Sequence, residues 1–172
     1  KLYKIPPERV TYIPCGSLSI FRSFKPEFLI NSLEEYILFF GRVVKYKGID
    51  YLVRAFDKIS HLYPNIKLVI AGRGELWFDI PENKNIILIN KYISSSELIG
   101  LILNSLFVVV PYIDATHSAV VATSYTFGKP VIVTNVGGLS EIVKNNETGF
   151  VVSPKNPDEL AEKINELISN FE

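Results

Sequence analysis

The stretch LFVVVPYIDATHSAVVATSYTFGKPVIVTNVGGLSE, residues 106–141, decides the fold. Its first part, 106–110, is a continuous run of β-branched and aromatic residues, which is typical of a strand buried on both faces of a parallel sheet. A mostly apolar segment of helix length follows at 119–127, and 131–133 is a second short apolar run. The stretch therefore predicts a strand, a helix and a second strand, joined by a right-handed crossover.

The ends of this helix carry further information. Gly128 is expected as the residue that terminates the helix, and Pro130 prevents its continuation. The helix should begin near 116–118, after a polar loop that lies at the carboxyl edge of the sheet. Open α/β sheets bind ligands at that edge. The unpaired N–H groups and the dipole of the helix would then face an anion in the crevice.

The rest of the chain alternates strand and helix signals. Strands are expected at 10–13, 36–40, 66–71, 86–89 and 149–152, and helices at 28–35, at 49–63, after a capping box at 94–97, at 140–144 and from 156 onward. This alternation predicts an α/β fold with a doubly wound, Rossmann-like parallel sheet. Residues 1–23 are interpreted as a linker and first strand, and 24–172 as a single domain.

Composition excludes several classes of protein. With 172 residues, of which 48% are hydrophobic, the chain is long enough to bury its own core. Lys+Arg and Asp+Glu number 18 each, so no global basic field points to nucleic acid. The single cysteine, Cys15, suits a reducing compartment, and no apolar run reaches the length that spans a bilayer. We therefore expect a cytoplasmic protein.

The basic loop GRVVKYKG, residues 41–48, is the strongest local signal for function. It follows a buried strand and precedes a helix, so it belongs to the same sheet edge as the loop at 112–118. Arg42 offers a bidentate fork and Lys47 a point charge for a diphosphate, although the loop alone is also compatible with a solvated basic turn. The glycines at 72 and 74 do not complete a dinucleotide fingerprint, because Trp77 stands where the third glycine is needed.

Taken together, these pieces resemble the nucleotide-sugar glycosyltransferases of the GT-B fold, in particular the large retaining group (glycosyltransferase group 1, or family 4) that contains sucrose, glycogen and mannosyl transferases. The resemblance rests on IPCG (13–16), GR (41–42), KG (47–48), LVIAGRG (68–74), FGKPVI (127–132), GGLSEIV (137–143) and TGF (148–150), in that order. It covers nearly the whole chain and implies the C-terminal, donor-binding half of a GT-B enzyme.

The resemblance also implies a set of site residues. Donor contacts are expected from Gly41, Arg42, Lys47, Gly72, Tyr92, Ile93, Thr116, Ser118, Thr123, Gly138 and Glu141, and catalytic roles from Arg42, Lys47, Asp114 and His117. A nucleotide sugar would be the donor substrate, with no separate cofactor and no metal. The acceptor would bind to an N-terminal domain of the full-length protein, whose association with a membrane stays open.

The sequence departs from this family at one point. The family's two usual glutamates are replaced by Ala115 and Thr123; Asp114 is expected to take over part of the first role, and Thr123 offers only a hydroxyl to a ribose. His117 has a plain loop histidine as its alternative interpretation, and Glu141 a helix-start carboxylate. Two other functions therefore stay open: a nucleotide-sugar epimerase, and a non-catalytic nucleotide-sugar-binding domain.

Overall fold

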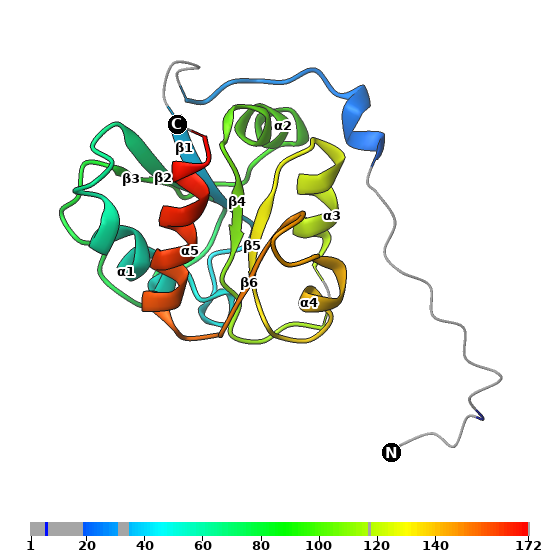
Figure 1. Ribbon diagram of the computed structural model, residues 1–172. Coiled ribbons are helices and arrows are strands. Elements are labelled where there is room, and N and C mark those ends of the chain that lie inside the picture. Colours follow the sequence, from blue (N-terminus) through cyan, green and yellow to red (C-terminus); the bar gives the residue numbers. More distant parts are fainter. Residues whose placement is uncertain (1–5, 7–18, 31–34, 117, 172) are drawn as a thin grey trace.

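The computed structural model describes residues 6, 19–30, 35–116 and 118–171 (Figure 1). Its strands are β1 (Glu35–Phe40), β2 (Ile66–Ala71), β3 (Ile86–Ile89), β4 (Val108–Val110), β5 (Val131–Thr134) and β6 (Gly149–Val152). Its helices are α1 (Ile49–Ile59), α2 (Ser95–Asn104), α3 (Ala119–Thr126), α4 (Leu139–Ile142) and α5 (Pro157–Ser169), with 3-10 turns η2 (Ser19–Ser23) and η3 (Lys45–Lys47).

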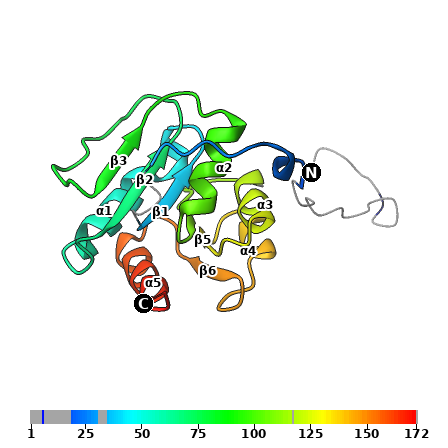
Figure 2. The ribbon, with the colours of Figure 1, turned by 90° about the horizontal axis from the view of Figure 1, so that it is seen from above.

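These strands form one sheet in the order β3-β2-β1-β4-β5-β6, and every neighbouring pair is parallel. Figure 2 shows α1 and α5 on one face of the sheet and α2, α3 and α4 on the other. The predicted doubly wound, Rossmann-like α/β fold is confirmed. Within the described ranges, no helix has both the length and the apolar character needed to cross a membrane.

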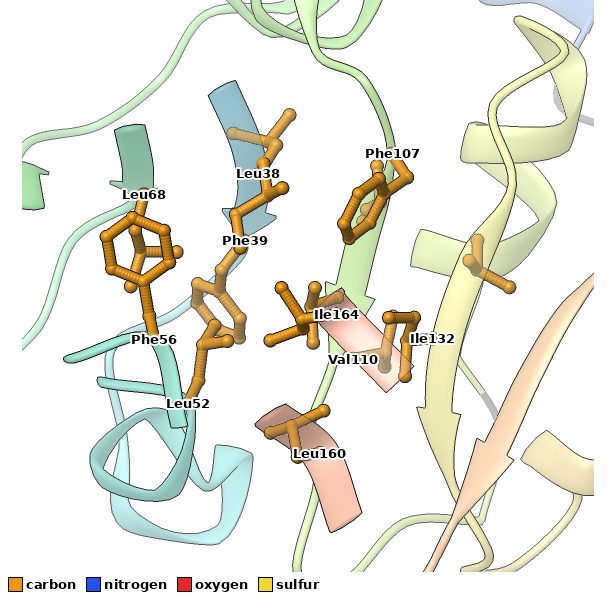
Figure 3. Close-up of a cluster of buried hydrophobic side chains, with 14 of the residues drawn as sticks. Leu38, Phe39, Leu52, Phe56, Leu68, Phe107, Val110, Ile132, Leu160 and Ile164 are labelled. Atoms are coloured by element: carbon orange, nitrogen blue, oxygen red, sulfur yellow. The ribbon is translucent and has the colours of Figure 1, made fainter. Parts of the chain in front are cut away.

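The core lies between the sheet and its helices. Figure 3 shows Leu52 and Phe56 of α1, with Leu160 and Ile164 of α5, directed toward the same layer of strand side chains, which includes Phe39. All five are buried. Because helices cover both faces of the central strands, β1 and β2 are apolar at nearly every position, and each large side chain buried in this way stabilises the fold by about 1.5–3 kcal/mol.

The central unit at 106–141 forms as predicted. Pairing with β1 already begins at Leu106, whose N–H donates to the Tyr36 carbonyl over 2.8 Å. Ser118 caps α3 by accepting a hydrogen bond from the N–H of Val120. Gly128 follows α3 with a φ of 68°, the left-handed conformation that ends a helix at little cost only for glycine.

The helix starts predicted at 94–97 and at 156 are also confirmed. Ser94 and Glu97 form a reciprocal capping box at α2, and Asn156 caps α5 with Pro157 at its first turn. The helical spacing of Leu160, Ile164, Leu167 and Phe171 predicts that all four side chains are buried, but the side chain of Phe171 is 50% exposed. Since α5 ends at Ser169, Phe171 no longer follows the helical period, although its ring stacks on Phe107.

The helix predicted at 49–63 ends earlier, at Ile59. The chain tightens there into turns in which the N–H of Leu62 donates to the Ile59 carbonyl. Tyr63 then points toward α5, where its hydroxyl donates to Asn165 Oδ1 over 2.8 Å. The helical spacing of apolar residues therefore continues past the end of the helix. Tyr63 belongs to the turn, and it contacts α5 from there.

The helix predicted at 28–35 is not found in its described part. Residues 28–30 are irregular, and Glu35 already belongs to β1. The preceding residue explains this, because the N–H of Glu27 donates to the Ser96 carbonyl and holds the segment along α2. The strand predicted at 10–13 and Cys15 lie outside the described residues. The domain division at 23–24 stays a prediction.

Candidate functional site

The strand order reverses between β1 and β4, and this switch point positions the candidate site. β1 leads to α1 and to β2 on one side, whereas β4 leads to α3 and to β5 on the other. The loops that follow β1 and β4 therefore diverge at the carboxyl edge of the sheet, which is where open α/β sheets bind ligands. These are the basic loop at 41–48 and the polar loop at 111–118, which the sequence predicted would meet.

The two loops are in direct contact. Gly48 has a φ of 65°, and a Cβ atom added to it would lie 2.0 Å from the carbonyl oxygen of Pro111. The N–H of Ile113 donates to the Tyr46 carbonyl over 2.8 Å. Both contacts connect backbone to backbone, so they fix the spacing of the loops independently of side-chain motion.

The two cations predicted to bind phosphate lie in the first of these loops. Arg42 is exposed, and its Nη2 donates to the Tyr46 hydroxyl over 3.1 Å. The Lys47 ammonium lies 3.5 Å from the centre of the Tyr112 ring and 5.2 Å from that of Tyr46. Burial, with a smaller contribution from the Arg42 charge, lowers the pKa of Lys47 to about 8. The first loop therefore carries two cationic side chains close to each other.

A pocket of about 240 Å³ opens beside Arg42. It is lined by Phe40, Gly41, Arg42, Ala71, Gly72, Arg73, Tyr92, Ile93 and Leu98. Five of these were predicted site residues: Gly41, Arg42, Gly72, Tyr92 and Ile93. Most of the remaining lining side chains are apolar, and Tyr92 is 79% exposed at the edge. The pocket thus offers apolar surface and an aromatic ring next to a cationic site.

Close packing of two glycines shapes this pocket. A Cβ atom on Gly72 would lie 1.8 Å from the carbonyl oxygen of Gly41, so no other residue fits without moving the backbone. The side chain of Asn90 holds the next part of the loop: its amide accepts from the N–H of Gly74 over 3.0 Å and donates to the Gly74 carbonyl over 2.9 Å. The wall of the pocket is therefore fixed from two sides.

The start of α3 follows the second of the two loops. Ser118 is buried, and its Oγ is 3.2 Å from the Tyr112 hydroxyl. The carbonyl of Thr116 accepts from the N–H of Gly138 over 2.9 Å, which joins the loop before α3 to the loop before α4. Asp114 and Thr116 are exposed in this loop. His117 lies outside the described residues, and its role stays a prediction.

Two further predicted residues, Thr123 and Glu141, belong to helices α3 and α4. Thr123 is buried in α3, and its hydroxyl donates to the Ala119 carbonyl over 2.7 Å, so the donor of this hydroxyl is engaged inside the helix. Glu141 is exposed in α4, just after Gly138. Within the described part of the chain, neither side chain forms a hydrogen bond or ion pair with Arg42 or Lys47. The ribose and sugar contacts expected of Thr123 and Glu141 stay predictions.

Comparison with known proteins decides the family. The family model described as "Glycosyl transferases group 1" matches residues 21–172. The chain belongs to this glycosyltransferase family. It is 33% identical, over 156 residues, to the uncharacterized glycosyltransferase MJ1607 of Methanocaldococcus jannaschii, covering 87% of this chain and 40% of that protein. It is 32% identical, over 180 residues, to the capsular polysaccharide biosynthesis glycosyltransferase CapM of Staphylococcus aureus, covering 94% and 47%.

Solved structures show the same fold. Sucrose-phosphate synthase from Thermosynechococcus elongatus superposes with a TM-score of 0.76 and 23% identity, over 92% of this chain and 43% of that one. Anabaena HepE in complex with UDP-glucose gives 0.69 and 19%, over 81% and 40%. The predicted recognition of a GT-B glycosyltransferase domain is confirmed. The chain spans less than half the length of the curated relatives it matches.

Several residues of this candidate site were not predicted from the sequence. Arg73 and Leu98 line the pocket, and Tyr112 contacts Lys47. The sequence did contain an indication that Arg73 belongs to the site. Arg73 stands between two glycines directly after a buried strand, as Arg42 stands directly after Gly41. Tyr112 had no such indication, because its contacts with Lys47 and Ser118 depend on how two separate loops pack.

Proposed function

We infer that this domain binds the diphosphate of a nucleotide sugar between Arg42, Lys47 and the start of α3, and serves a glycosyltransferase that passes the sugar to an acceptor. The observation that carries this proposal is the convergence of both cations and a capped helix start at the switch point of the sheet. Fixed cations and helix N–H groups favour an anion there.

This arrangement suits the departure of a nucleoside diphosphate from a sugar carbon. Negative charge grows on the leaving phosphate during that step, and groups already held in position stabilise it more than mobile ones do. Arg42 can grip phosphate oxygens with two N–H groups, and Lys47 supplies a compact charge beside it. The chemistry requires no histidine as acid or base. We propose retention of configuration at the sugar carbon, as in the retaining group that the sequence resembles.

The pocket beside Arg42 is the proposed place for the nucleoside. Tyr92 at its edge and the apolar side chains of Ile93 and Leu98 offer surface to a flat base, and the pocket opens next to the cation that would hold the diphosphate. The structure of HepE with UDP-glucose supports a nucleotide sugar as the class of donor. CapM supports a role in making polysaccharide or glycoconjugate. We propose that the acceptor binds to a further domain, since the relatives are more than twice as long as the matched part.

A thermal-shift panel tests the proposal. UDP, GDP, ADP and their common sugar conjugates are added to the 172-residue chain, and at least one base series should raise the melting temperature. Ligand at about 100 times its dissociation constant adds about 2.7 kcal/mol to the free energy of unfolding. If no nucleotide stabilises the chain and calorimetry detects no binding, the proposed site is wrong.

A turnover assay then separates the three functions that the sequence left open. The stabilising donor is incubated with a longer form of the protein that includes the remaining domain, with and without sugar acceptors. Transfer with retained configuration at the sugar carbon supports the proposal. An epimerised sugar formed from the donor alone would identify an epimerase, and binding without turnover of any donor would identify a non-catalytic domain.

A further inference from the structure

Tyr112 belongs to the second loop of the candidate site but was not expected to contact a donor. It follows Pro111 at the end of β4, and its side chain is only 1% exposed. The Lys47 ammonium lies 3.5 Å from the centre of its ring, and its hydroxyl lies 3.2 Å from the Ser118 Oγ. One buried side chain thus contacts both anion-binding elements.

We propose that Tyr112 is a positioning residue: its ring holds the Lys47 ammonium, and its hydroxyl fastens the start of α3, so that both elements meet a diphosphate in one fixed geometry. The inference rests on the proposed function, because it assigns a role within the same diphosphate site.

The ring is suited to holding Lys47 without neutralising it. A cation above an aromatic face is attracted by the quadrupole of the ring, which carries no net charge. Among the residues that the structure describes, no carboxylate forms an ion pair with Lys47. A carboxylate partner would compete with a phosphate for the ammonium, whereas Tyr112 orients the ammonium and leaves its charge available to the ligand.

The hydroxyl end of Tyr112 is equally constrained. Burial raises the pKa of Tyr112 to about 12, so the hydroxyl stays neutral and keeps its hydrogen at physiological pH. Its partner Ser118 also accepts from the N–H of Val120, so the contact with Tyr112 helps to orient the residue that caps α3. The backbone of Tyr112 is held as well, because its carbonyl accepts from Thr134 Oγ1 over 2.6 Å.

The fixed backbone matters because a positioning residue must not move itself. Thr134 is buried at the end of β5, and the next residue along the loop, Ile113, is tied to Tyr46. Tyr112 is therefore anchored to the sheet on one side and to the basic loop on the other. Because Tyr112 is fixed to the sheet, its ring restricts the position of the Lys47 side chain, which would otherwise sample many rotamers.

The test compares Tyr112→Phe, which keeps the ring, with Tyr112→Leu, which removes it. Binding of inorganic pyrophosphate, which needs no knowledge of the base, is measured by calorimetry on the 172-residue chain. We expect Tyr112→Leu to weaken binding by roughly 3- to 10-fold and Tyr112→Phe by no more than about 3-fold. In a Lys47→Ala background, Tyr112→Leu should have much less effect, because the group that the ring positions is gone.

A second readout separates positioning from general loss of structure. The NMR signal of the Lys47 carbon that is bonded to the ammonium nitrogen is followed as the pH is raised. The titratable and aromatic groups around this ammonium include Arg42, Tyr46 and Tyr112. The midpoint of the Lys47 titration should stay near that of the unsubstituted chain in Tyr112→Phe and move toward the ordinary lysine value in Tyr112→Leu, because the freed ammonium returns to water. Loosened packing elsewhere would not move this midpoint.

The outcomes distinguish the two proposals. If Lys47→Ala leaves pyrophosphate binding unchanged, the proposed diphosphate site itself fails. If Lys47→Ala weakens binding while Tyr112→Leu changes neither the affinity nor the Lys47 midpoint, the site stands and the role of Tyr112 is overturned. If Tyr112→Leu both weakens pyrophosphate binding and moves the Lys47 midpoint, the positioning role is supported.

Discussion

Gly48 and Pro111 are packed so closely that a Cβ atom on Gly48 would lie 2.0 Å from the Pro111 carbonyl oxygen. This contact joins the loop that carries Arg42 and Lys47 to the loop that leads into α3. The approach is possible only for glycine, both because of the distance and because Gly48 has a φ of 65°. The geometry of the candidate site thus depends on a residue that has no side chain.

We expect Gly48→Ala to lower the free energy of unfolding by about 2 kcal/mol or more, since the backbone of one loop must move in addition to the cost of a left-handed residue. Chemical denaturation measures this loss, and calorimetry should show weaker diphosphate binding. Gly128→Ala is the matched control, because Gly128 has a similar φ of 68° but nothing within 4 Å of the added Cβ. Gly128→Ala should cost only about 1 kcal/mol and leave binding unchanged. Equal losses in both variants would argue against the packing of Gly48 on Pro111.

The paired hydrogen bonds of Asn90 to Gly74 lead to a second prediction. Asn90→Ala should loosen the wall of the pocket and weaken nucleotide binding by roughly 1 kcal/mol, with a similar loss of stability. Asn83→Ala is a suitable control, because Asn83 also makes side-chain hydrogen bonds, to Asp57 and Ser60, but does not line the pocket. A nucleotide affinity that falls equally in both variants would show that stability, not the pocket, controls binding.

The lowered pKa of Lys47 predicts opposite effects of pH on stability and on binding. Between about 8 and about 10.5 the unfolded chain holds a proton that folded Lys47 has lost, so this group makes stability rise with pH in that window. A bound diphosphate favours the charged form, so affinity should instead fall as pH rises above about 8. Denaturation and calorimetry across this window check the two signs. Lys47→Arg should flatten the fall in affinity, because arginine keeps its charge; an unchanged slope in this variant would assign the pH dependence to another group.

The sequence predicted the two loops of the candidate site and the caps of several helices because these signals are local. A capping box at Ser94 and Glu97 can be recognised from residues three apart, and a cationic loop after an apolar run points to the carboxyl edge of a parallel sheet. Gly128 and Pro130 mark the end of a helix in the same way. Each of these features needs only its neighbours in the chain to be interpreted.

The remaining features depend on contacts between distant segments. The Tyr112 ring contacts the Lys47 ammonium because two loops pack together. Nothing in the residue spacing of either loop indicates this contact. Thr123 was predicted from its place in a motif, but only the structure shows that its hydroxyl donates to Ala119. Tyr63 has helical spacing with α1 yet reaches Asn165 of α5 from a turn. In each case the local sequence pattern contains the residue itself but not the residue that it contacts.

Metal dependence gives a further prediction. In the proposed site, Arg42 and Lys47 supply the positive charge that a divalent ion supplies at phosphates in other enzymes. Nucleotide binding should therefore survive treatment with EDTA, within about 2-fold in affinity. Calorimetry before and after chelation measures this directly. A large loss that magnesium or manganese restores would contradict the role given to these cations.

Arg42 and Lys47 are proposed to bind the diphosphate of the donor, and calorimetry on one variant of each residue measures this binding. Arg42→Ala and Lys47→Ala should each weaken nucleoside diphosphate binding by roughly 1.5–3 kcal/mol, the range for hydrogen bonds to charged groups, while the matching nucleoside loses much less. Lys45→Ala is the control, because Lys45 belongs to the same loop but lines neither the pocket nor the Tyr112 ring. Its affinity should match that of the unsubstituted chain. Unchanged diphosphate affinity in both Arg42→Ala and Lys47→Ala would contradict the account.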